Sequence, residues 1–156
     1  MKKKGKVLLQ VMVLMGTVLW GAAVFSAVRW YSLHEGMEKA HEEKKPLIVD
    51  FFYGKGCPRC EVLQTQVYDN PDISRKIMAD FIPVRIDLTK KLDEEEEKLG
   101  EQYEYKKDCL LLFLDHKGEV IKTPQGKSLC FMDTVDPEGF IQYLDFVKAH
   151  YRTSGQ

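Results

Sequence analysis

The chain has 156 residues and a formal net charge of −1, with 44% hydrophobic and 30% charged residues. This length suits one domain and excludes a two-domain enzyme with a separate substrate domain. The charge is uneven, because the first 28 residues hold four lysines and no acid, whereas the rest hold 19 basic and 24 acidic residues. Since no basic patch is present to neutralise phosphates, we do not expect the chain to bind nucleic acid.

Residues 1–28 are predicted to be a targeting segment. Lysines at the start precede an apolar run over residues 7–28, which is the pattern of an export signal. A run of this length also suffices to span a bilayer, and small residues at Ala23 and Ala27 suit a signal peptidase. A cleaved signal peptide and an N-terminal membrane anchor therefore remain alternatives. Both place the rest of the chain on the non-cytoplasmic side, because the lysines stay inside.

The remaining chain alternates predicted helices and strands, which indicates an α/β fold with a central mixed sheet covered by helices on both faces. The helices are inferred from apolar residues three or four positions apart, and the strands from short apolar runs. In chain order we expect a helix over 33–43, a strand over 47–53, a helix from Pro58, a helix over 73–78, a strand over 81–86, a helix over 92–103, strands over 109–115 and 119–122, an edge strand over 127–132 and a helix over 137–150. These elements form one domain over residues 30–150, followed by a short tail over 151–156.

The chemistry is expected at Cys57-Pro58-Arg59-Cys60, which follows a predicted buried strand and begins a predicted helix. A thiolate at a helix N-terminus meets the positive end of the helix dipole and unpaired N–H groups, which lower its pKa. The second cysteine lies one turn away and can close a disulfide. We therefore expect Cys57 to be exposed and to attack, and Cys60 to be more buried and to resolve. Arg59 adds a positive charge that makes the couple more oxidising.

Several segments in order resemble the thioredoxin-like superfamily. They are residues 45–52, the Cys57–Cys60 motif, and residues 67–73, 81–87 and 113–119. Together they are similar to the exported bacterial branch that includes the DsbD C-terminal domain and DsbH, over roughly residues 30–149. The resemblance implies a three-layer thioredoxin-like fold and a thiol–disulfide oxidoreductase without an organic cofactor.

The same resemblance implies partners and a location. Protein thiols and disulfides are the expected substrates, and a membrane redox partner is expected to recycle the cysteine pair. We expect a monomer in the bacterial periplasm that meets the membrane only through its N-terminal segment. It is either soluble after signal cleavage or anchored in the inner membrane by residues 7–28.

The resemblance also assigns residues to roles. Asp50 matches a buried acid on the first core strand, which helps to deprotonate the resolving cysteine, and its burial is expected to raise its pKa. Pro58 and Arg59 tune the pair. Gly56 stands where the family usually has tryptophan. Cys109 falls at the family's cis-proline position, where a cis bond before a non-proline residue would cost about 3 kcal/mol, so we expect a trans bond and a third sulfur near the pair.

Cys109 and Cys130 leave alternatives open. Four cysteines allow three pairings, of which we favour Cys57–Cys60 with a possible second disulfide between Cys109 and Cys130; two buried free thiols are the other option. A different function is a metal-binding module or metallochaperone, with Cys57, Cys60 and Cys109 as soft ligands for copper or zinc. A third is a scaffold domain whose motif is only structural. Reductase, oxidase and isomerase share these residues, so the direction of electron flow stays open.

Overall fold

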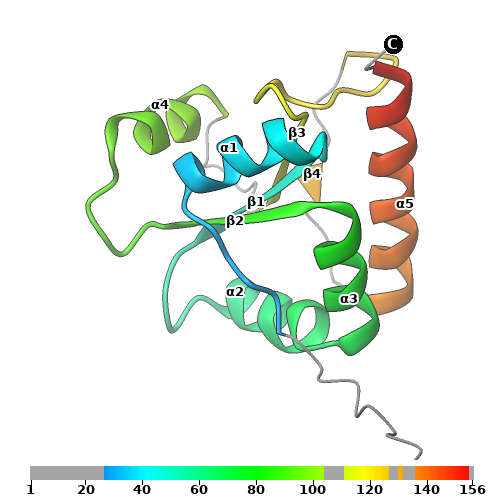
Figure 1. The fold of residues 1–156 in the computed structure, drawn as a ribbon. Coiled ribbons are helices and arrows are strands. Elements are labelled where there is room, and N and C mark those ends of the chain that lie inside the picture. The colour runs from blue at the N-terminus through cyan, green and yellow to red at the C-terminus, as the bar shows by residue number, and fades with distance from the viewer. Residues whose placement is uncertain (1–26, 104–110, 127–129, 132–135, 155–156) are drawn as a thin grey trace, which may run out of the picture.

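The computed structural model describes residues 27–103, 111–126, 130–131 and 136–154, and Figure 1 shows their arrangement. In chain order the elements are α1 (Leu33–Glu43), β1 (Leu47–Phe52), α2 (Pro58–Val62), the π-helix η1 (Leu63–Tyr68), α3 (Pro71–Asp80), β2 (Ile82–Asp87), α4 (Glu94–Gln102), β3 (Leu111–Leu114), β4 (Cys130–Phe131) and α5 (Pro137–Ser154). Within these ranges, no helix has the length and apolar character needed to cross a membrane. The predicted targeting segment lies outside the described residues except for its last two, and of these Val28 is buried in the core.

The sheet has four strands in the order β2-β1-β3-β4. β1 runs parallel to β2, and the helices between them make the crossover that a parallel pair requires. β1 is antiparallel to β3, which is antiparallel to β4. The predicted mixed sheet is therefore confirmed, with β1 at its centre.

Local signals explain where the helices begin. Ser32 caps α1, and its side chain and that of Glu35 form a reciprocal capping box. Asn70 caps α3, and Pro71 occupies its first turn, where a missing N–H costs nothing. The predicted range 33–43 is confirmed to the residue, whereas α3 begins two residues earlier than predicted because the cap was not used in the prediction.

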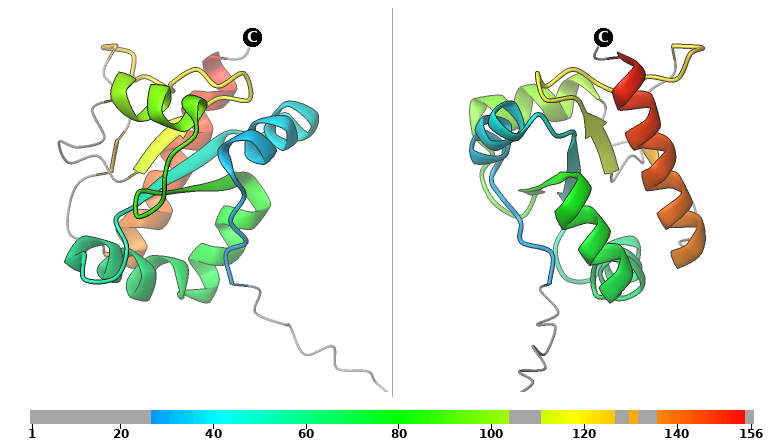
Figure 2. Two further views of the ribbon diagram at one scale, coloured as in Figure 1. Left: turned by 90° about the vertical axis from the view of Figure 1, so that its left-hand side faces the viewer. Right: turned by 45° about the vertical axis from the view of Figure 1, so that its right-hand side comes forward.

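β1 is buried on both faces, and its side chains alternate between two hydrophobic clusters. Leu47, Val49 and Phe51 belong to the cluster that includes residues of α1, and Ile48 belongs to the cluster that includes residues of η1, α3 and α5. Figure 2 shows the helices on both sides of the sheet. Asp50 lies two residues after Ile48 on β1, so both side chains point to the same face of the sheet. This is the face covered by the helix that follows the cysteine motif.

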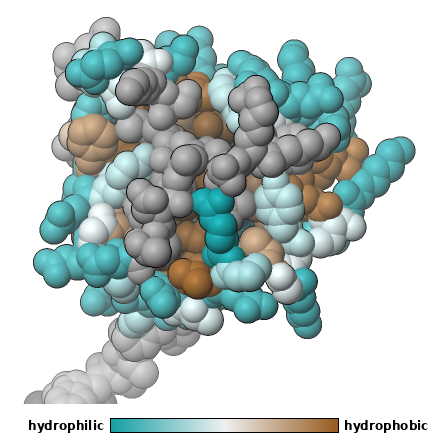
Figure 3. Space-filling model, turned by 180° about the vertical axis from the view of Figure 1, so that it is seen from behind, coloured by the Kyte–Doolittle hydropathy of each residue, from teal (hydrophilic) through white to brown (hydrophobic). Residues whose placement is uncertain are grey.

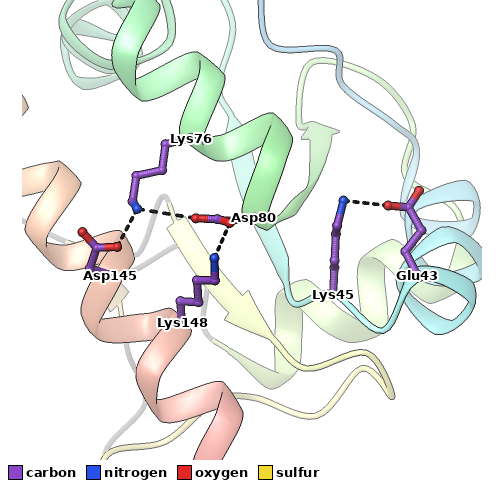
Figure 4. A network of polar contacts seen from close by, with 6 residues as sticks. All are labelled: Glu43, Lys45, Lys76, Asp80, Asp145 and Lys148. Carbon is purple, nitrogen blue, oxygen red and sulfur yellow. Dashed lines mark hydrogen bonds and ion pairs between the residues drawn. The ribbon is translucent and has the colours of Figure 1, made fainter.

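A chain of ion pairs joins α3 to α5 (Figure 4). Lys76 Nζ lies 2.5 Å from Asp145 Oδ1 and 3.4 Å from Asp80 Oδ2, and Lys148 pairs with Asp80 as well. Asp80 is mostly buried, so these pairs are less screened than an exposed pair would be. They hold α5 against the helix layer that carries the site. The Glu43–Lys45 pair in the same figure, at 2.8 Å, lies at the end of α1.

Three expectations were wrong in detail. The predicted strand over 119–122 is reduced to isolated bridge positions at Val120 and Lys122, of which Val120 pairs with Leu114. Val62 was expected on an apolar stripe but is 37% exposed. The buried face follows Cys60, Leu63 and Val67, which are three and four residues apart, and Val62 lies off that face. α5 continues to Ser154, four residues beyond its predicted end.

Candidate functional site

The cysteine motif forms the turn between β1 and α2. Cys57 is the N-cap of α2, and its sulfur accepts a hydrogen bond from the Cys60 N–H at 3.2 Å. Pro58 takes the first helical position, as expected. Cys57 and Cys60 are joined by a disulfide across a Cα–Cα distance of 5.3 Å. Cys57 is partly exposed and Cys60 is 6% exposed, which is the expected difference between an attacking and a resolving cysteine.

Gly56 explains why no aromatic residue precedes the motif. Its φ is +90°, in the left-handed region that favours glycine, and nothing lies within 4 Å of the place where a Cβ would be. The backbone conformation, and not lack of space, therefore selects glycine. Its N–H donates to Glu61 Oε1 at 3.3 Å, so a carboxylate from α2 reaches back across the turn next to Cys57.

Asp50 is 3% exposed on β1. It stands in register with Arg85 on β2, whose Nε donates to Asp50 Oδ2 at 2.7 Å. Burial raises the pKa of Asp50 to about 6, although the charge and hydrogen bond of Arg85 and the nearby Tyr68 hydroxyl act to lower it. The prediction of a buried acid with a raised pKa is confirmed.

The π-helix η1 brings two polar side chains to this pair. Gln64 Oε1 accepts from Arg85 Nη2 at 3.4 Å. Tyr68 is fully buried, and its hydroxyl makes no hydrogen bond of ordinary geometry although it lies close enough to the carboxylate to influence it. Burial, followed by the charge of Asp50, raises the pKa of Tyr68 well above its usual value. π-helical turns inside helices are often found at functional sites.

Sequence reasoning missed Arg85. Besides Asp50, its guanidinium faces three aromatic rings, with centroids 4.1 Å away for Trp30, 4.9 Å for Phe52 and 5.5 Å for Tyr68. A signal was available, because Arg85 is a basic residue inside a predicted apolar strand of the same sheet as Asp50. Burying opposite charges in neighbouring strands is unfavourable unless they pair.

Residues 29–116 match a family model described as thioredoxin-like. The chain belongs to the thioredoxin-like family. Similar solved structures include a DsbH oxidoreductase, at 18% identity over 96% of this chain and 95% of that one with a TM-score of 0.57. A thioredoxin from Thermus thermophilus has 22% identity over 84% and 95%, with a TM-score of 0.60. The oxidised C-terminal domain of Neisseria meningitidis DsbD has 17% identity over 76% and 98%, with a TM-score of 0.52.

A curated relative extends the comparison beyond bacteria. Human spermatogenesis-associated protein 20 is 29% identical over 70 residues, which are 44% of this chain and 9% of that protein. This chain therefore spans a small part of the length of that relative. The family match and the solved structures confirm the predicted thioredoxin-like fold, and a disulfide-forming C-x-x-C at the start of a helix is an arrangement that supports thiol–disulfide oxidoreductase activity.

Two predicted site residues of this thioredoxin-like protein stay untested. Cys109 lies outside the described residues. Cys130 lies on β4, in register with Leu112, but its side chain is not described, so their pairing stays a prediction. No group of three or more histidine, cysteine or acidic side chains is placed to hold a metal ion in the described part of the chain. The metal-site alternative depends on Cys109 and is not tested by this finding.

Replacing Glu61 with glutamine is expected to lower the pKa of the Cys57 thiol in the reduced protein. The Glu61 carboxylate bonds to the N–H of the residue before Cys57, and a nearby negative charge disfavours a thiolate. The rate of alkylation by iodoacetamide, measured against pH, should rise at a lower pH than in the wild type. Glu38→Gln on α1, on the opposite face of the sheet, is the control and should leave the profile unchanged. An unchanged or more alkaline profile for Glu61→Gln would contradict this prediction.

Proposed function

We propose that this protein is a thiol–disulfide oxidoreductase that exchanges disulfides with protein substrates through Cys57 and Cys60. The observation that carries the proposal is the disulfide between a partly exposed N-cap cysteine and a buried cysteine one turn further on. Hydrogen bonding and the helix N-terminus favour the thiolate at Cys57. The thioredoxin-like family membership supports the same chemistry.

The exchange proceeds through a mixed disulfide. The Cys57 thiolate attacks one sulfur of a substrate disulfide, forms a bond to it and expels the other sulfur as a thiolate. The Cys60 thiolate then attacks Cys57 Sγ, which releases the substrate as a dithiol and leaves the Cys57–Cys60 disulfide. The pair loses the two electrons that the substrate disulfide gains. The reverse sequence oxidises a substrate dithiol.

Asp50 is the proposed proton acceptor for Cys60. Its position on the face of β1 toward η1 and its burial support this role. A carboxyl with a pKa of about 6 can both take up and release a proton near neutral pH. Arg85 stabilises the ionised form, so that burial does not keep the acid permanently protonated.

The proposed setting is the bacterial periplasm, with a membrane redox partner that recycles the pair. The lysine-led apolar segment over residues 1–28 supports export.

We also propose that the protein is a monomer. In the described residues the large exposed hydrophobic side chains are Tyr53, Val62 and Phe146. On the face shown in Figure 3, the coloured residues include both hydrophilic and hydrophobic side chains. These three exposed side chains come from different parts of the described fold, whereas a protein–protein interface is usually a large contiguous apolar patch, and this supports the proposal of a monomer.

A redox titration tests the function. The full-length protein is equilibrated with reduced and oxidised glutathione, the free thiols are alkylated, and the state of Cys57 and Cys60 is determined by mass spectrometry. We expect the pair to change between dithiol and disulfide together, and Cys109→Ser to titrate in the same way. A pair that does not cycle would refute the proposal, as would stoichiometric copper or zinc held through Cys109 by the reduced protein.

A further inference from the structure

The first described residues form a short strap along the outer edge of β2, shown in blue in Figure 1. The Tyr31 N–H donates to the Pro83 carbonyl at 3.0 Å, and the Arg85 N–H donates to the Tyr31 carbonyl at 3.1 Å. Val28 is buried in the core. Because the backbone is held on both sides of it, Trp30 has a fixed place next to Arg85.

The Trp30 ring covers the guanidinium of Arg85. The ring centroid lies 4.1 Å from Arg85 Cζ, closer than those of Phe52 and Tyr68. The indole also meets the Tyr68 ring edge to face at 4.8 Å. The Arg85 side chain is only 20% exposed. A guanidinium is attracted to an aromatic face, and the attraction grows when water is excluded.

We propose that Trp30 is a positioning residue of the redox centre, because its indole holds the Arg85 guanidinium against the Asp50 carboxylate. The inference rests on the proposed function, since it concerns the residue assigned to take the proton of Cys60. Among the described residues, the groups that act on the ionisation of Asp50 are Arg85 from β2 and the Tyr68 hydroxyl from η1. In the proposed function the Cys60 thiol of the reduced protein faces Asp50 as well. Trp30 acts on the acid through Arg85.

The direction of the effect follows from the contacts. Arg85 counteracts the burial of Asp50 and so favours its ionised form. A guanidinium released from Trp30 can turn toward water, and its attraction to the carboxylate then weakens. The pKa of Asp50 is therefore expected to rise when the indole is removed.

The test uses full-length Trp30→Leu, with Tyr31→Leu as the matched control. Tyr31 comes from the same strap, but its ring lies beside Arg29 and Lys39, at 5.3 and 5.6 Å. The pKa of Asp50 is measured by carbon-13 NMR of its carboxyl, and the rate of the Cys60-dependent step is measured against pH. Trp30→Leu should raise the pKa of Asp50 by about half a unit or more, which is about a threefold change in its acid dissociation constant. The pH profile of the rate should move to higher pH by the same amount. Tyr31→Leu should move neither.

Two further variants guard against a merely structural effect. Trp30→Phe keeps an aromatic face and should restore much of the wild-type pKa. In an Arg85→Met background, Trp30→Leu should cause no further shift. An unchanged or lowered Asp50 pKa in Trp30→Leu, or an equal shift in Tyr31→Leu, would overturn the inference. If the wild type fails to exchange disulfides, the proposed function falls, but the NMR titration still decides whether Trp30 acts on Asp50.

Discussion

A Cys60→Ser variant is expected to accumulate as mixed disulfides between Cys57 and substrate proteins. Cys57 is partly exposed at the start of α2 and keeps its attacking position in this variant. A serine hydroxyl does not displace a thiolate from a disulfide, so the second half of the exchange is lost while the first half remains. Non-reducing gels of cells that express the variant should show adducts that disappear on reduction, and mass spectrometry should identify the proteins held on Cys57.

Cys57→Ser is the matched control for this experiment. It leaves only Cys60 of the pair, which is 6% exposed and therefore out of reach of a protein disulfide. Few adducts should form. Equal trapping by both variants would contradict the assignment of attacking and resolving cysteines. If the adducts disappear when Cys109→Ser is combined with Cys60→Ser, the attacking cysteine would be Cys109 and not Cys57.

Asp50→Asn is expected to make the oxidised protein more stable at pH 8, by about 3 kcal/mol, because the pKa of Asp50 is about 6 in the folded protein against 3.8 for the free carboxyl. Below the lower value the acid is protonated in both the folded and the unfolded state. As the pH rises toward 6, the unfolded chain releases its proton and the folded protein retains it, so stability is lost. Above pH 6 the folded protein also releases the proton, and the loss of stability is complete. Asparagine cannot ionise, so the variant does not lose stability in this way.

Urea unfolding at pH 4 and pH 8 measures this effect. The wild type and Asp50→Asn should differ little at pH 4 and most at pH 8. Asp72→Asn removes an exposed carboxylate on α3, with 74% of its side chain accessible. This variant keeps Asp50, so its stability should differ from that of the wild type by the same small amount at both pH values. Parallel curves for wild type and Asp50→Asn would contradict the raised pKa. The same variant should resolve mixed disulfides more slowly, which would show that an unfavourable buried acid is retained for its activity.

The sequence predicts most of the fold because its local signals agree with one another. The apolar run after Pro46 is central in the sheet as β1, and Pro58 marks the start of the helix that begins at the motif. These features depend on residues close together in the chain. The exposure difference between Cys57 and Cys60 follows from the same local geometry, so it is also predictable.

The features that were missed depend on distant pairings or on small departures from regular geometry. The Arg85–Asp50 pair requires the register of two strands whose partners are 35 residues apart. η1 shifts the helical repeat within one turn, and an apolar pattern with a period near 3.6 residues does not reveal this shift. Trp30 was not distinguished from its neighbours at the end of the apolar N-terminal run, so its contact with the site was not foreseen.

The strap at the edge of β2 has a consequence for association between molecules. An uncovered edge strand offers a row of free backbone groups to which a second extended chain can add, and this is a common route to aggregation. Here Pro83 has no N–H, and Tyr31 occupies both the Pro83 carbonyl and the Arg85 N–H. A chain shortened to begin at Ser32 would present these groups to solvent. Such a chain is expected to aggregate by edge pairing at concentrations where the full chain stays dispersed, as light scattering would show.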